Sequence, residues 1–129
     1  MRDAARPSPR PARRPAADPK GRLGPGADLR LCLTSVPSRH AARIADLLVT
    51  ARVAACVSIL PGVVSVYRWK GKVERAREVL LLVKTTATAA ARCAALLAEA
   101  HPYDVPEILV AIPEQAAEAY AAWLRAETA

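Results

Sequence analysis

Residues 54–72, with the sequence AACVSILPGVVSVYRWKGK, decide the fold of this chain. Two runs rich in Val, Ile, Tyr and Trp are separated by Pro61-Gly62 and closed by Lys70-Gly71-Lys72, a pattern typical of strands that meet at turns. Apolar side chains occupy both faces of the second run, because successive residues of a strand point to opposite sides. We therefore expect a long hairpin in the core of a β-sheet.

A later run, Val79–Val83, reads VLLLV and has no polar face at all. Strands that are apolar on both sides must be covered on both sides. The helical patterns of this chain suffice for one face of so small a sheet, so copies of the same chain are expected to cover the other. The sequence therefore predicts a homo-oligomer.

The other elements follow from the spacing of their apolar residues. Residues 29–35 alternate strictly, with leucines on one side and Cys32 on the other, which predicts a half-buried strand with Cys32 as the most accessible of the three cysteines. Ser38 is expected to cap a helix that ends near residues 50–52 and buries Ala41, Ile44, Ala45 and Leu48. The further predictions are a charged connection at 75–78, a strand at 79–85, a helix from Thr86 or Thr88 to His101, a strand at 107–112, and a helix at 115–126 that buries Ala119, Ala122, Trp123 and Ala126.

This order, β-α-β-β-α-β-α, is the split arrangement of ferredoxin-like folds with one extra helix at the end. We expect an α+β domain over residues 28–129, with helices on one face of an antiparallel sheet and a bare second face. That bare face agrees with the predicted oligomer.

Residues 1–27 are rich in Pro, Arg and Ala and carry seven Arg and Lys residues against two Asp residues. Leu23 is their one large aliphatic side chain after Met1, so this segment is predicted to be a disordered tail. A basic tail can bind nucleic acid, but such runs are usually only solvated, and nucleic acid is an unlikely partner. The sequence has neither a secretory signal pattern nor a membrane span, so we expect a soluble cytoplasmic protein without a membrane partner.

No motif in the sequence requires an enzyme. The phosphate-loop spacing, the G-x-S-x-G elbow and the H-E-x-x-H zinc helix are all absent. Cys32, Cys56 and Cys93 are odd in number and widely spaced, which favours reduced thiols over a disulfide framework or zinc knuckle. We expect a binding protein without catalytic residues.

The densest polar cluster is His101-Pro102-Tyr103-Asp104-Val105-Pro106-Glu107. An imidazole and two carboxylates suit a copper or zinc ion. Alternatively, His101 and Asp104 satisfy backbone groups at a helix end while Glu107 pairs with a basic side chain. Residue types alone leave both interpretations open.

Tyr67 and Trp69 share one strand face next to Arg68, Lys70 and Lys72. A stacking platform for nucleic-acid bases normally has more aromatic residues than the five in this chain. Packing against Trp123 or a neighbouring subunit is the better interpretation, since aromatic residues anchor interfaces.

An ordered series of motifs resembles the CutA family of divalent-cation tolerance proteins from about Leu29 to Ala126. The matching segments are Ala54-Ala55-Cys56, Leu60-Pro61-Gly62, residues 65–72 (SVYRWKGK), Glu78-Val79-Leu80, Lys84-Thr85, residues 101–107 (HPYDVPE) and Tyr120-x-x-Trp123. The resemblance implies a homotrimer of ferredoxin-like subunits, similar to PII signal proteins, that binds copper or another divalent cation and takes part in the response to metal ions.

The resemblance also implies site residues. His101 and Glu107 match family ligands, and Asp104 and Cys32 are further metal candidates. Cys32 lies beside Leu33, the position at which some bacterial members carry cysteine, and a shift of one residue reverses the strand face. The alternative function is a trimeric scaffold or PII-like small-ligand sensor with clefts between subunits, whose candidate residues are Tyr67, Trp69, Lys70, Tyr103 and Trp123.

Overall fold

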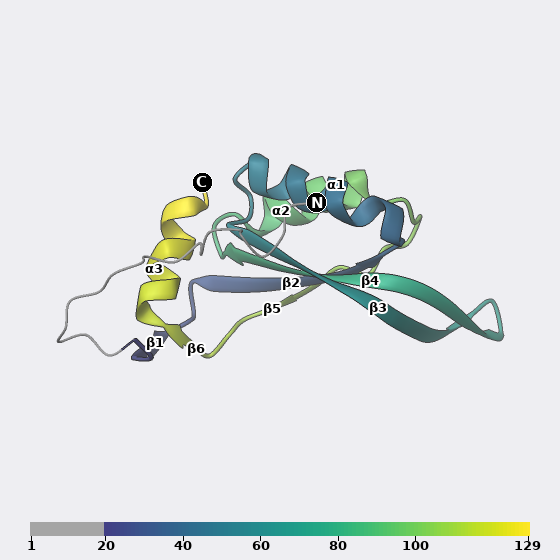
Figure 1. Cartoon of the computed structure of the whole chain (residues 1–129), viewed down its shortest axis with the longest axis horizontal. Coiled ribbons are helices and arrows are strands. Elements are labelled where there is room, and N and C mark those ends of the chain that lie inside the picture. The colour runs from purple at the N-terminus through teal and green to yellow at the C-terminus, as the bar shows by residue number, and fades with distance from the viewer. Residues whose placement is uncertain (1–19) are drawn as a thin grey trace.

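A four-stranded antiparallel sheet with strand order β3-β4-β2-β5 forms the frame of the molecule, in a computed structural model that describes residues 20–129. Helices α1 and α2 lie on one face of this sheet (Figure 1). This is the predicted ferredoxin-like α+β arrangement. The bounds are β2 (Leu29–Val36), α1 (Ser38–Thr50), β3 (Cys56–Trp69), β4 (Lys72–Thr86), α2 (Ala90–Ala100) and β5 (Leu109–Ala111).

The β3–β4 hairpin extends beyond the helices (Figure 1), and Pro61-Gly62 is not the predicted turn. Leu60 pairs with Leu80 and Val63 with Glu78, so β3 advances three residues while β4 advances two. The extra residue is a β-bulge, which Gly62 accommodates at φ 78°. Both runs therefore belong to one strand, and the predicted charged connection at 75–78 is part of β4.

The face beneath α1 and α2 holds the main hydrophobic core. The predicted α1 stripe is confirmed, since its four residues are the buried ones of that helix, although Pro37 rather than Ser38 occupies the N-cap. Cys32 is only 2% exposed and belongs to this core, so the prediction that it is the most accessible cysteine was wrong. A free cysteine is a small apolar side chain that fits well between a sheet and its helices.

The opposite face of the sheet, the open face, carries the other half of each strand. Directly paired residues of antiparallel strands share a face, so the register extends this surface across all four strands. The two central leucines, Leu33 and Leu82, are half-buried, and Leu109 at the edge is 58% exposed. The apolar residues that the register assigns to this face include Leu31, Leu33, Leu60, Leu80, Leu82 and Leu109.

A second, smaller unit packs at one end of the sheet (Figure 1). Here β1 (Leu23–Pro25) pairs with β6 (Gln115–Ala117), followed by α3 (Glu118–Glu127). The prediction of disorder was wrong for 23–25; for residues 1–19 it lies outside the described residues. A Cβ on Gly26 would lie 2.4 Å from the Pro113 carbonyl oxygen, so this long-range approach depends on glycine.

The last helix and strand differ in detail from their predictions. Helix α3 begins three residues later than expected because Gln115–Ala117 pairs with β1, and it buries Ala121 and Leu124 instead of the predicted face. Strand β5 is shorter than the predicted 107–112. Helix α2 ends at His101 as predicted, and the Thr86 hydroxyl accepts a hydrogen bond from the Ala89 amide just before it begins. Among residues 20–129, no helix combines the length and apolarity needed to cross a membrane.

Candidate ligand-binding site

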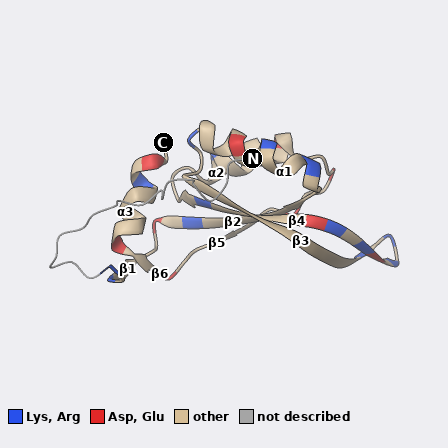
Figure 2. Ribbon diagram, in the orientation of Figure 1, with Lys and Arg blue, Asp and Glu red and all other residues tan. Residues whose placement is uncertain are grey.

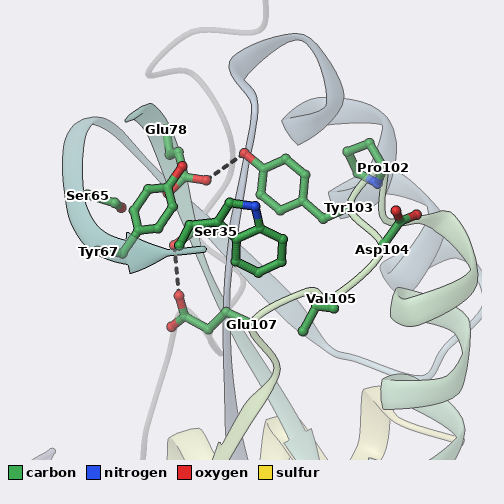
Figure 3. A pocket seen from close by; sticks show the side chains of 10 residues that line it. Ser35, Ser65, Tyr67, Glu78, Pro102, Tyr103, Asp104, Val105 and Glu107 are labelled. Atoms are coloured by element: carbon green, nitrogen blue, oxygen red, sulfur yellow. Dashed lines mark hydrogen bonds between the residues drawn. The ribbon is translucent and has the colours of Figure 1, made fainter. Parts of the chain in front are cut away.

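A pocket of about 550 Å³ opens between the hairpin and the segment that joins α2 to β5. The bulge places Tyr67 and Trp69 on the same face as Glu78, because it shifts the alternation of β3 by one residue. In Figure 3, Tyr67 lies on one side of the pocket and the loop carrying Tyr103 on the other. The lining residues are Ser35, Ser65, Tyr67, Trp69, Glu78, Pro102, Tyr103, Asp104, Val105 and Glu107.

His101 supports the segment that joins α2 to β5, and its side chain is only 7% exposed. Its Nε2 lies 2.9 Å from the Ser35 carbonyl oxygen, and its Nδ1 accepts a hydrogen bond of 3.2 Å from the Tyr103 amide. A carbonyl can only accept and an amide can only donate, so the ring is neutral with its proton on Nε2. Both ring nitrogens are occupied, which makes His101 a structural anchor for this segment.

Glu78 is a nearly buried carboxylate, 9% exposed, at the side of the pocket formed by β4. The Tyr103 hydroxyl donates a hydrogen bond of 2.6 Å to its Oε2, as Figure 3 shows. Burial, together with this hydrogen bond and the charge of Glu78, raises the pKa of Tyr103 to about 12. Tyr103 therefore stays a protonated donor at neutral pH.

Two further carboxylates belong to the loop. The Ser35 hydroxyl donates a hydrogen bond of 3.2 Å to Glu107 Oε1, and Asp104 is exposed. Within residues 20–129 the ion pairs are Arg22 with Glu118 and Arg125 with Asp28, both at the far end of the molecule. The three pocket carboxylates therefore lack a basic partner within the described chain.

The four predicted metal candidates do not form one site in this chain. His101, Asp104 and Glu107 belong to one segment, but Cys32 lies in the core beneath the helices, on the face of β2 opposite Ser35. Burial also raises the pKa of the Cys32 thiol, which disfavours the thiolate that metals bind. Within the described part of the chain, no group of three or more His, Cys, Asp and Glu side chains could hold a metal ion.

The structure brings three of the five predicted cleft residues together in the pocket. Tyr67, Trp69 and Tyr103 line the pocket. The Lys70 ammonium lies 6.0 Å from the centre of the Trp69 ring but outside the lining. Trp123 does not line the pocket; it packs against Tyr120 at the other end of the sheet, with ring centres 5.6 Å apart.

Sequence reasoning missed Ser35, Ser65 and Glu78 as site residues. Glu78 was placed in a charged connection, although it continues the alternation of Leu80, Leu82 and Lys84 along one face of β4. That two-residue period was the available signal. No local signal marks Ser35, because only the fold brings it to Glu107.

Comparison with known proteins places this geometry in one family. The sequence model of the "CutA1 divalent ion tolerance protein" family matches residues 30–127. The divalent-cation tolerance protein CutA of Thermus thermophilus is 46% identical over 97 residues, which cover 74% of this chain and 94% of that protein.

Solved structures agree with that match. CutA from Synechococcus elongatus superposes with a TM-score of 0.80 at 40% identity, over 84% of this chain and 96% of that one. The apo form of the PII-like protein CutA from Nostoc superposes with a TM-score of 0.73 at 36% identity, over 78% and 97%. On the sequence match and the shared fold, this chain belongs to the CutA1 family of divalent ion tolerance proteins.

Proposed function

We propose that this chain is a non-enzymatic, homotrimeric binding protein that acts in divalent-cation tolerance. Membership of the CutA1 family supports the role in tolerance. The observation that carries the assembly is the apolar open face, which continues across four strands. The expected cytoplasmic location stays a prediction.

Assembly follows from the physics of that face. Large contiguous apolar patches are rare on monomers and mark surfaces that bind a partner. A second copy of the same chain is always available as a partner, and most soluble oligomers are closed symmetric assemblies of one chain. A trimer would cover Leu109 and the half-buried leucines beside it.

Changing Leu109 to Glu tests the assembly. Its side chain is 58% exposed, so the single chain should tolerate the charge, whereas a buried interface should not. We expect a trimeric mass by sedimentation equilibrium for the parent protein and a smaller mass for the variant. Val49→Glu, at an exposed position of α1, is the matched control and should keep the parent mass. A monomeric parent protein would contradict the proposal.

Copper or another divalent cation is the proposed ligand for the tolerance role, bound weakly through Glu107, Asp104 and His101. No three-ligand group exists within residues 20–129, and we propose that a second subunit supplies the remaining donors. His101 would have to release one of its two hydrogen bonds. Glu107, Asp104 and His101 therefore fit a metal site that assembly completes, and they do not fit a metal site preformed in one chain. Cys32 fits neither kind of site.

Calorimetric titration of chelator-stripped protein with copper tests the ligands. We expect uptake near one ion per subunit that is lost in the His101→Ala, Glu107→Ala double variant. Glu99→Ala, at an exposed position of α2, is the control and should bind as the parent does. Copper uptake that the double variant leaves unchanged would overturn the assignment of these residues.

A second candidate function is a PII-like sensor of a small molecule. The observation that favours it is the pocket itself, whose 550 Å³ falls in the range of small-molecule sites. The relative from Nostoc is described as PII-like. A trimer that takes up no ion but binds a small molecule would favour this candidate over the first.

A further inference from the structure

The pocket is negatively charged. Its lining holds three carboxylates, Glu78, Asp104 and Glu107, and no Lys, Arg or His. Glu78 and Glu107 accept hydrogen bonds from the hydroxyl groups of Tyr103 and Ser35, and within residues 20–129 neither carboxylate forms an ion pair. Asp104 and Glu107 are exposed, whereas Glu78 is only 9% exposed, and a nearly buried carboxylate without an ion-pair partner is costly. A cation in the pocket would relieve this cost.

Aromatic rings form the rest of the wall. Tyr67, Trp69 and Tyr103 come from two different segments and line the same cavity. Figure 3 shows Tyr67 and Tyr103 on either side of it. The face of an aromatic ring attracts an organic cation, most strongly at Trp. The Lys70 ammonium, 6.0 Å from the centre of the Trp69 ring, already occupies such a position just outside the lining.

The chemistry of this wall distinguishes between classes of cation. A hydrated divalent ion needs six or more oxygen ligands or a close set of His, Cys and carboxylate groups, and aromatic rings supply none of these. The described residues contain no such set. An organic ammonium ion is larger and less hydrated, and it uses both carboxylates and ring faces. A nucleotide would bring phosphate charges next to the three carboxylates, which disfavours it.

We propose that this pocket binds a small organic ammonium ion, with its carboxylates as counter-charges and its aromatic rings as walls. The inference rests on the second candidate function, the small-molecule sensor, and names the class of ligand. It predicts that positive charge, rather than shape alone, selects the ligand.

Calorimetry on the full-length chain tests the charge requirement. The probes are choline, a quaternary ammonium, and 1,4-diaminobutane, a primary diammonium at neutral pH. The neutral control is 3,3-dimethylbutan-1-ol, which has the shape of choline without its charge, and the anionic control is ATP. We expect at least one ammonium probe to bind with a Kd below about 1 mM, and the neutral and anionic probes to bind at least about tenfold more weakly.

Variants locate the site. Glu78→Gln keeps an oxygen that can accept from Tyr103 but removes the charge, and should weaken ammonium binding at least about tenfold. Trp69→Leu should weaken it about fivefold through the loss of the ring face. Glu99→Gln, outside the pocket, should have no effect. Lys70→Gln should not weaken binding, whereas a site for anions would lose affinity.

Three results would overturn the inference: no heat from either ammonium probe, equal affinity for choline and its neutral isostere, or ATP binding that depends on Trp69. Trimer mass and copper uptake measured on the same sample keep the outcomes separate. A trimer that takes up copper but no ammonium ion refutes the ligand class and leaves the tolerance role standing. ATP binding would refute an organic ammonium ion as the ligand class but would leave the small-molecule sensor as a candidate function.

Discussion

The two faces of the four-stranded sheet differ in what completes them. One face is closed by the chain itself where α1 and α2 cover it, with Leu81 fully buried between strands and helices, although Val64 and Val66 on the outer part of the hairpin are exposed on the same face. The open face combines exposed and half-buried leucines with a polar group, in which Lys84 donates hydrogen bonds to Ser58 and Cys56. One face thus stabilises the subunit, and the other carries the surfaces that we propose for assembly and for ligands.

Charged residues are unevenly distributed along the sheet. Figure 2 shows Lys, Arg, Asp and Glu mainly on the helices and on the outer half of the hairpin, whereas most of the sheet carries other residues. A solvent-exposed sheet face is normally polar, because alternation puts polar side chains towards water. The leucines of the open face depart from this pattern, which is the basis of the assembly proposed above.

Truncating neighbouring leucines of β4 gives the largest expected effect. Leu81→Ala removes a fully buried side chain and should lower the free energy of unfolding by about 3 kcal/mol. Leu82→Ala, one residue along and on the open face, should cost roughly 1 kcal/mol in the Leu109→Glu background, where assembly is weakened. Urea denaturation followed by circular dichroism measures both values.

In the assembled parent protein the cost of Leu82→Ala should rise, because a partner then buries that side chain. Equal costs of Leu81→Ala and Leu82→Ala in the weakened background would contradict the distinction between the faces. If Leu82→Ala lowers the free energy of unfolding equally in the parent protein and in the Leu109→Glu background, the result would argue against an interface at Leu82.

Much of the fold could be predicted from the sequence, because the spacing of apolar residues that marks a helix or a strand is a local property. The α1 stripe, the end of α2 at His101-Pro102 and the ferredoxin-like order all depend on short-range spacing or on proline. The alternation of β2 suggested that its leucine side is the buried one, but the side that carries Cys32 lies under the helices and the leucines lie on the open face. Cys32 was therefore assigned to the wrong side.

The candidate site was predicted only where its residues are close in sequence. Residues 101–107 were recognised as one polar segment, and Tyr67 with Trp69 as one strand face. Ser35 and Glu78 joined them only through strand pairing and the bulge, which sets the alternation of β3. The β1–β6 pair was missed for the same reason: Leu23 and Ala117 are brought together by the fold, and neither segment has the length or pattern of a strand.

Removing the Tyr103 hydroxyl at the pocket should have an effect of intermediate size on the free energy of unfolding. Tyr103→Phe leaves the nearly buried Glu78 carboxylate without its donor and should cost about 1–2 kcal/mol of unfolding free energy. Tyr67→Phe is the matched control, since the Tyr67 hydroxyl has no hydrogen-bond partner among residues 20–129, and should be close to neutral. Denaturation of both variants at pH 7 provides the measurement. A larger loss for Tyr67→Phe would mean that Glu78 is satisfied by another group.

The smallest effect concerns the contact that ties α3 to the start of β2. Arg125 Nε donates a 2.6 Å hydrogen bond to Asp28, and this bond lowers the pKa of the Asp28 carboxyl from 3.8. A depressed pKa gives stability that is present above the unfolded value and is lost as the pH falls through the folded value. Both side chains are largely exposed, so Arg125→Gln should cost less than about 1 kcal/mol at pH 7. As the pH falls through the lowered pKa of Asp28, the difference in stability between the parent and the variant should shrink towards zero, because the carboxyl becomes protonated in both. A difference that does not shrink would assign the role of Arg125 to packing instead of charge.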